Sequence, residues 1–68
     1  MSDHVYKLIE VVGSSTQSLE EGIENGIARA SETVDLVEWF KVEEVRGAVK
    51  DGKVAHYQVV LKIGFRLT

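Results

Sequence analysis

The feature that most constrains the fold is a tight turn, Lys50-Asp51-Gly52-Lys53, which lies between two long β-prone segments. An Asp-Gly pair is typical of two-residue type I′ hairpins, because both central residues need a positive φ. We therefore predict an antiparallel hairpin of a strand over 38–48 and a strand over 54–67. Its register gives four cross-strand pairs: Trp39 with Gly64, Phe40 with Ile63, Val42 with Leu61, and Val45 with Gln58.

Side chains alternate most regularly in the last segment, where successive residues of a strand point to opposite faces. The predicted core set is Tyr57, Val59, Leu61, Ile63, Phe65 and Leu67, and the opposite set is His56, Gln58, Val60, Lys62, Gly64 and Arg66. Trp39, Val45 and Val60 are expected on the face away from the core. This mixture of apolar and polar residues is more typical of an interface than of a solvated surface.

The first half of the chain predicts a strand followed by a helix. Residues 4–12 are β-branched and apolar on both side-chain sets, which indicates a strand covered on both faces. Ser15 is a plausible N-cap for a helix of about 18 residues that fades over residues 33–36. Its buried stripe at i, i+4 spacing is Leu19, Ile23, Ile27, Ala30 and Val34. Gly22 and Gly26 lie four residues apart on one side of this helix, which indicates close packing against the sheet or a neighbouring subunit.

The element order strand–helix–strand–strand predicts a single α+β domain over residues 1–68. A right-handed helical crossover joins parallel strands, so the third strand lies between the other two in a three-stranded antiparallel-type sheet. One helix packs on one face. The helix spans about 27 Å and the last strand about 46 Å, so one helix cannot cover the sheet. The chain has 68 residues and no cysteine, and oligomerisation is the remaining means of stabilising so small a domain.

Composition excludes several classes of protein. The net charge of −3 and the pI near 5.2 argue against nucleic-acid binding. No apolar run approaches the length of a membrane span, so we expect no membrane partner. The absence of cysteine is compatible with a reducing cytoplasm, where we expect the protein. Two histidines without cysteines are too few for a metal site, and we predict none.

Two residues suggest a site for a planar ligand. Trp39 is the single tryptophan and lies on the face away from the core, where it either stacks on a flat ring or is buried between subunits. Gln58 is on the same predicted face, and its amide can match a carbonyl–imide edge or simply face solvent. Together they would suit a flat heteroaromatic ring.

Charged residues leave more alternatives open. Arg29, Arg46 and Arg66 can grip a phosphate or form salt bridges between subunits. The carboxylates of Glu38, Glu43 and Glu44 are better explained by solvation or by ion pairs with Arg46 or Arg66 than by catalysis. No Ser-His-Asp constellation and no glycine-rich phosphate loop is present, so we expect no enzyme.

Six short motifs, in order and at matching spacing, give the chain a resemblance to a known family. They are Val12-Gly13-Ser14-Ser15, Ile27-Ala28-Arg29-Ala30, Trp39-Phe40, Val45-Arg46-Gly47, Tyr57-Gln58-Val59-Val60 and Gly64-Phe65-Arg66-Leu67. Over essentially its whole length the chain resembles the dodecins of bacterial type, which are small flavin-binding proteins.

The resemblance implies a homododecamer, a hollow shell with helices outside and sheets inside. It implies flavin pairs stacked between tryptophans of neighbouring subunits, with Trp39 as the stacking residue and Gln58 on the pyrimidine edge of the ring. Glu38 matches a residue near the ribityl chain and Arg46 one near the flavin. Bacterial members favour phosphorylated flavins such as FMN, archaeal members favour riboflavin or lumichrome, and FAD is a further candidate. Some bacterial members also hold coenzyme A, with which Arg29 and Arg66 are candidate contacts.

The expected function is flavin storage and photoprotection, because stacked tryptophan quenches an excited flavin by electron transfer. The alternatives are a coenzyme A-binding or purely structural shell and, less favoured, a flavin-dependent enzyme. No general acid or base is placed near the expected ring.

Overall fold

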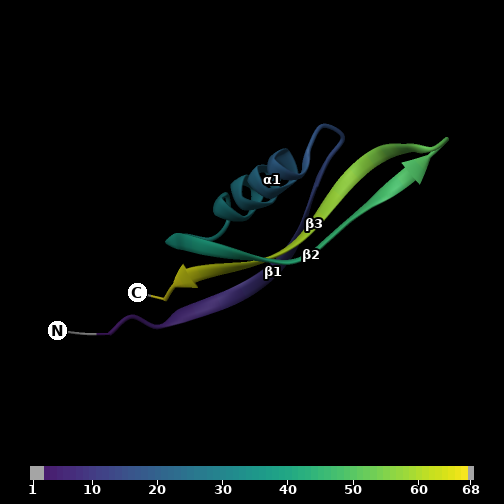
Figure 1. Cartoon of the computed structure of the whole chain (residues 1–68). Coiled ribbons are helices and arrows are strands. Elements are labelled where there is room, and N and C mark those ends of the chain that lie inside the picture. The colour runs from purple at the N-terminus through teal and green to yellow at the C-terminus, as the bar shows by residue number, and fades with distance from the viewer. Residues whose placement is uncertain (1–2, 68) are drawn as a thin grey trace.

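The computed structural model describes residues 3–67, which form one three-stranded sheet with one helix against it (Figure 1). The elements in chain order are β1 (Tyr6–Ser15), α1 (Leu19–Ser31), β2 (Val37–Lys50) and β3 (Lys53–Arg66). The strand order is β1-β3-β2, and β3 pairs antiparallel with both neighbours. The predicted α+β class and the central place of the last strand are therefore confirmed. Because β1 and β2 both run antiparallel to β3, they run parallel to each other, as expected for strands joined through a helix.

The β2–β3 pairing contains three bulges, at Glu38, Glu43 and Ala55, of which those at Glu43 and Ala55 cancel. Counted from the turn, Ala55 is an extra residue on β3 and Glu43 is an extra residue on β2. Beyond both bulges the predicted pairs are confirmed: Trp39 with Gly64, Phe40 with Ile63 and Val42 with Leu61. Between them the predicted register is wrong by one residue, and Gln58 faces Arg46 in place of Val45. Val45 instead faces the buried Val59, so it lies on the same face as α1 and not on the opposite face.

The helix begins later and is shorter than its apolar stripe predicts. Its N-cap is Ser18, whose Oγ accepts a hydrogen bond from the Glu21 amide at 3.0 Å. The prediction of Ser15 as the N-cap is wrong because β1 continues through Ser15, which pairs with Tyr57. The Ser15 hydroxyl organises the connecting loop, where it accepts the Gln17 amide at 2.8 Å. The helix has 13 residues, compared with the predicted 18 or so.

Glycine allows α1 to approach β1 closely. A Cβ on Gly13 would collide with the carbonyl oxygen of Gly22, and a Cβ on Gly26 would lie 3.0 Å from Cδ1 of Leu61. All three glycines are buried. The predicted close packing of the Gly22–Gly26 side is therefore packing of the helix against the sheet of its own chain.

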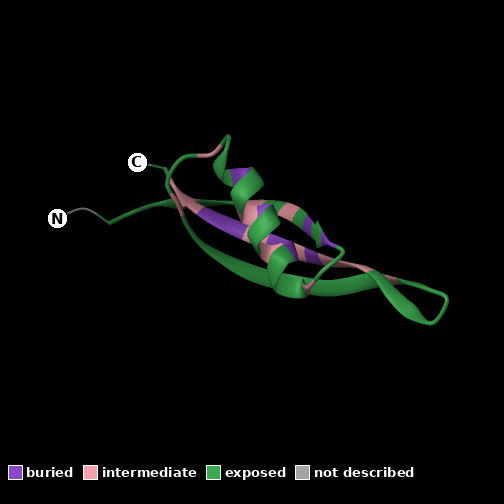
Figure 2. Ribbon diagram, turned by 90° about the horizontal axis from the view of Figure 1, so that it is seen from above, coloured by how far each residue is buried: buried purple, intermediate pink, exposed green. Residues whose placement is uncertain are grey.

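The core is small and follows the central strand (Figure 2). Val59, Leu61 and Ile63 are completely buried, and Ala30 of α1 closes over them. The residues packed around them are Ile9, Val11, Ile23, Ile27 and Val37. Leu67, which was predicted in the core, is half exposed because it lies beyond the end of β3.

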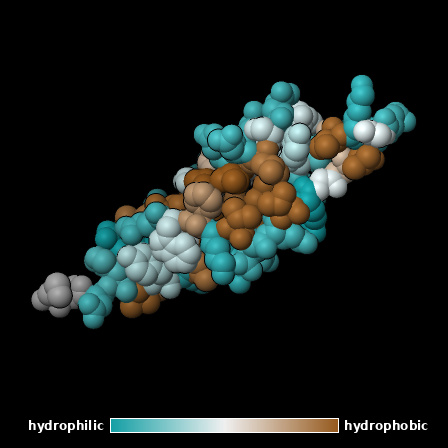
Figure 3. Space-filling model, in the orientation of Figure 1, coloured by the Kyte–Doolittle hydropathy of each residue, from teal (hydrophilic) through white to brown (hydrophobic). Residues whose placement is uncertain are grey.

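Much of the sheet has no cover from the helix. The chain measures 56 × 20 × 14 Å, and the β2–β3 hairpin projects past the end of α1 (Figure 1). The helix packs on β1 and β3, so Phe40 and Val42 of β2 are 45% and 39% exposed although they point to its side of the sheet. Apolar side chains gather at the middle of the molecule and again near the hairpin end (Figure 3). The expectation that one helix cannot cover this sheet is confirmed. Within residues 3–67, no helix has the length and hydropathy needed to span a membrane.

Candidate functional site

Three of the four predicted flavin contacts, Trp39, Arg46 and Gln58, lie on the face of the sheet opposite α1, which we call the open face. By strand alternation and register, its members are Tyr6, Leu8, Glu10, Val12 and Ser14 of β1, Trp39, Lys41, Glu44 and Arg46 of β2, and Gln58, Val60, Lys62, Gly64 and Arg66 of β3. Nothing in the described part of the chain covers it (Figure 1). It holds two distinct groups, one at each end.

Trp39 rests on the bare backbone of β3. A Cβ placed on Gly64 would lie 2.5 Å from Cζ2 and 2.7 Å from Cδ2 of the indole, so both rings lie over this glycine. Tyr6 of β1 contacts the indole from the side, with the ring centroids 6.4 Å apart at an interplanar angle of 63°. The indole is 41% exposed. One side of the ring is therefore held against the sheet and the other is free to stack.

Glu38 lies beside this aromatic group and is paired with an arginine. It is an extra residue in β2, since Val37 faces Phe65 and Trp39 faces Gly64. Its Oε2 lies 3.6 Å from Nη1 of Arg66 on β3. The predicted ion pair of the Glu38 carboxylate is confirmed, and it leaves the charge of this end of the open face balanced.

Gln58 and Arg46 form the second group, closer to the hairpin turn. They face each other across β2 and β3, and Nε of Arg46 donates a hydrogen bond to Oε1 of Gln58 at 3.2 Å. Nη1 of Arg46 also lies 3.5 Å from Oε1 of Glu44. The three side chains make a continuous polar row across the two strands.

The structure does not bring Trp39 and Gln58 of one chain together. Gly64, beneath the indole, is six residues from Gln58 along β3, which is about 20 Å at the usual rise of a strand. The surface between them carries Lys62 and Lys41, with Glu43 at 3.2 Å from Lys41 and 3.9 Å from Lys62. A fused three-ring ligand is shorter than this gap. One chain therefore cannot supply both contacts to one ligand.

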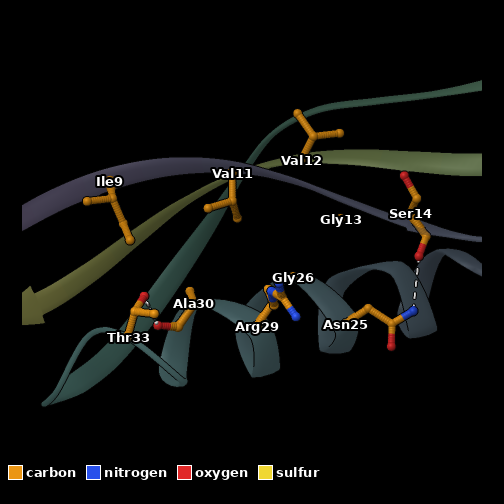
Figure 4. Close-up of a pocket in the computed structure, with 10 residues that line it drawn as sticks. All are labelled: Ile9, Val11, Val12, Gly13, Ser14, Asn25, Gly26, Arg29, Ala30 and Thr33. Atoms are coloured by element: carbon orange, nitrogen blue, oxygen red, sulfur yellow. Dashed lines mark hydrogen bonds between the residues drawn. The ribbon is translucent and has the colours of Figure 1, made fainter.

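A separate groove lies between β1 and α1, away from these groups (Figure 4). Its volume is about 390 Å³, and its floor is mostly apolar, with Val11, Gly26 and Ala30 among its lining residues. At one end Asn25 donates a hydrogen bond to the carbonyl of Ser14 at 3.0 Å. Arg29 borders the groove, but it is largely exposed and lies 3.6 Å from Glu32. None of the predicted flavin contacts lines this groove.

Metal ligands do not cluster within residues 3–67, where no group of three or more histidine, aspartate or glutamate side chains could hold an ion. Glu38, Glu43 and Glu44 each form an ion pair with a lysine or an arginine.

Two residues that shape the site, Gly64 and Tyr6, were not among the site residues predicted from the sequence. Gly64 supports the indole, and its predicted place opposite Trp39 was the signal that could have shown this. The position of Tyr6 beside Trp39 depends on the β1–β3 register, and the expected helical crossover does not determine that register. The ion pair of Glu44 with Arg46, at 3.5 Å, confirms one of the alternatives predicted for the glutamates, and the place of Glu44 on the open face follows from the bulge at Glu43.

The fold and the open face define a small α+β protein with one face of its sheet uncovered. The sequence model of the Dodecin family matches residues 5–68. The dodecin of Thermus thermophilus is 48% identical over 63 residues, which cover 93% of this chain and 91% of the relative. The calcium dodecin of Mycobacterium tuberculosis is 30% identical over 63 residues, 93% of this chain and 89% of the relative.

Solved structures agree with these relatives. The dodecin of Streptomyces coelicolor superposes with a TM-score of 0.93 at 48% identity, covering 100% of this chain and 97% of its own. A Thermus thermophilus structure gives 0.92 at 45% identity, with 97% of each chain covered. The chain belongs to the dodecin family, whose members are small oligomeric proteins.

Proposed function

We propose that this protein stores flavins in a homo-oligomer and protects the cell from their excited states. In this proposal the isoalloxazine ring stacks on the free side of Trp39, and Gln58 binds its carbonyl–imide edge. The observation that carries the proposal is the indole of Trp39, held flat over Gly64 on one side and exposed on the other. A rigid, half-exposed tryptophan is suited to stacking on a planar ring.

The proposal requires a second chain. Trp39 and Gln58 lie about 20 Å apart within one chain, so the stacking residue and the edge-binding residue of one site come from different subunits. A face on which apolar residues such as Leu8 and Val12 are half exposed supports assembly through this surface. Glu38, beside the aromatic group, and Arg46, on the open face, are then candidate contacts to the ribityl chain and to the rest of the flavin.

Quenching follows from stacking. An indole in contact with the ring can transfer an electron to the excited flavin before the flavin sensitises oxygen. The arrangement needs no general acid or base, and a ring stacked on both sides leaves little room for a substrate. FMN is the first flavin to test, followed by riboflavin, FAD and lumichrome.

A fluorescence titration of the flavin-free protein tests the proposal. Flavin emission is expected to fall and to saturate at one flavin per chain, on a particle that light scattering identifies as a dodecamer. A dodecamer that leaves the emission unchanged would overturn the flavin proposal. Binding of coenzyme A by that same particle would then favour the coenzyme A-binding shell.

Mixed assemblies test whether the site spans two chains. Trp39→Ala and Gln58→Ala chains are unfolded together and refolded, so that some contacts pair a chain with an intact Trp39 and a chain with an intact Gln58. A tight, quenched binding phase is expected in the mixture and absent from either variant alone. The matched control mixes Trp39→Ala chains with chains that carry both substitutions. Recovery in neither mixture would contradict the two-chain site.

A further inference from the structure

Gln58 is held in one of two orientations by its neighbour. A glutamine amide can be rotated by half a turn, which exchanges its acceptor oxygen and its donor NH₂ group. Here the Nε–H of Arg46 donates to Oε1 of Gln58 over 3.2 Å. A guanidinium carries only donors, so the rotated amide would place donor against donor. Arg46 therefore selects the orientation in which the NH₂ group of Gln58 points away from it.

Arg46 is itself fixed from the other side. Its Nη1 lies 3.5 Å from Oε1 of Glu44, two residues earlier on the same strand and on the same face. A guanidinium that contacts a carboxylate at one nitrogen and an amide oxygen at another has little freedom to rotate. The bulge at Glu43 brings this arrangement about, because without it Glu44 and Arg46 would point to the side of α1.

These contacts leave Arg46 occupied. Its side chain is about half exposed, but two of its nitrogens already face partners within its own chain. Resemblance to bacterial dodecins suggests an arginine that favours phosphorylated flavins. The contacts of this chain indicate a different role, because they direct the guanidinium at the side chain that reads the ring.

We infer that Arg46 is a positioning residue that fixes the Gln58 amide with its NH₂ donors toward the ligand, and so selects planar rings with a carbonyl acceptor at their edge. The inference rests on the proposed flavin function. It makes Arg46 a determinant of ring recognition and not of phosphate recognition. Riboflavin, which lacks the phosphate of FMN, should depend on Arg46 as strongly as FMN does.

Dissociation constants for riboflavin and FMN test the inference in Arg46→Ala, Arg46→Lys and Gln58→Ala proteins. Arg46→Ala is expected to weaken both ligands by the same factor, about three- to tenfold for an exposed charge-assisted hydrogen bond. Arg46→Lys keeps the charge but not the Nε donor, and is expected to resemble Arg46→Ala. In the Gln58→Ala background, Arg46→Ala should have no further effect. Lys50→Ala, at the hairpin end of the same strand, is the control for the lost charge.

Two results would overturn the inference. Weakening of FMN alone, restored by Arg46→Lys, would make Arg46 a phosphate contact. Weakening of both ligands by Gln58→Ala but of neither by Arg46→Ala would show that the amide needs no positioning.

A measurement without ligand separates this inference from the flavin proposal. The order parameter of the Gln58 side-chain nitrogen, from NMR relaxation, is expected to fall in Arg46→Ala and Glu44→Gln and to stay unchanged in Lys50→Ala. If no flavin binds but the order parameter falls, the flavin proposal fails and the positioning contact stands. An unchanged order parameter in Arg46→Ala would overturn the positioning role whether or not flavin binds.

Discussion

Each face of the sheet has a glycine that allows another group to approach the backbone closely, but the two contacts differ in what they leave exposed. On the covered face, Gly13 lets the backbone of α1 approach β1, and the contact closes the core. On the open face, Gly64 lets the indole of Trp39 approach β3, and the contact leaves the outer side of the ring exposed. Gly13 allows the helix to pack closely against the sheet. Gly64 supports the indole and leaves its outer side exposed to solvent.

The neighbours of each glycine explain this difference. Gly13 faces another main chain, which cannot rotate away, and Leu61 and Ala30 fill the space around the contact. Gly64 faces the end of a single side chain whose other neighbour, Tyr6, touches it only edge-on. Substitution at Gly13 should therefore be read out as loss of stability, and changes around Gly64 as loss of binding.

The largest expected effect is from Gly13→Ala. The added Cβ meets the carbonyl of Gly22, so α1 must move off the sheet, and the free energy of unfolding should fall by about 3 kcal/mol. Urea denaturation at fixed protein concentration measures the change. Ser14→Ala, the next residue on the same strand with its side chain on the open face, is the control and should change little. Equal midpoints for both variants would contradict the close approach.

Trp39→Ala should remove the stacking surface and leave the fold intact. Flavin affinity is expected to fall by about 1–3 kcal/mol, by analogy with base–aromatic stacking, and the flavin that still binds should fluoresce. The free energy of unfolding should fall less than in Gly13→Ala, because Trp39 is 41% exposed. Trp39→Phe keeps an aromatic surface and should retain part of the affinity. An affinity equal to that of the unmodified protein would exclude Trp39 as the stacking residue.

Gly64→Ala should displace the indole without removing it. The new methyl group occupies the place of the ring, so Trp39 must rotate away from β3, and flavin affinity should fall by about 1 kcal/mol. Near-ultraviolet circular dichroism reports the change in the environment of the indole. A flavin titration measures the affinity. In a Trp39→Ala background the same substitution should have no effect on binding. Equal losses in both backgrounds would mean that Gly64 acts by some route other than the indole.

Ser18→Ala tests whether the two faces are independent. Loss of the N-cap should lower the free energy of unfolding by about 1 kcal/mol, with no change in flavin affinity, because α1 lies on the covered face. Thr16→Ala is a matched control in the same loop. A parallel loss of affinity in Ser18→Ala would show that the faces are coupled.

The sequence predicts the hairpin well because two features agree, the Asp51-Gly52 turn and the alternation of β3. It predicts the wrong partner for Gln58 because neither Glu43 nor Ala55 carries a residue pattern typical of a bulge. Two errors of one residue cancel, which is why the Trp39–Gly64 pair was still correct. For the site, the sequence could predict that the side chains of Trp39 and Gln58 are suited to binding a flat ring. Their separation within one chain already follows from the predicted Trp39–Gly64 pair, because Gly64 is six residues from Gln58 on the same strand. The contact of Arg46 with Gln58 required the register that only the structure supplies.

The bulge at Glu43 also bears on how the chain can change. Every residue of β2 between Glu44 and Ala48 owes its side of the sheet to the way Glu43 is left out of the ladder. If Glu43 were deleted, Glu44 would follow Val42 directly, and Val45 and Arg46 would keep their partners Val59 and Gln58. If Glu43 were kept but paired as a regular residue, Arg46 would turn toward α1 and Val45 away from it, with no substitution at either position. This stretch therefore tolerates the loss of Glu43 better than the loss of the bulge that Glu43 forms.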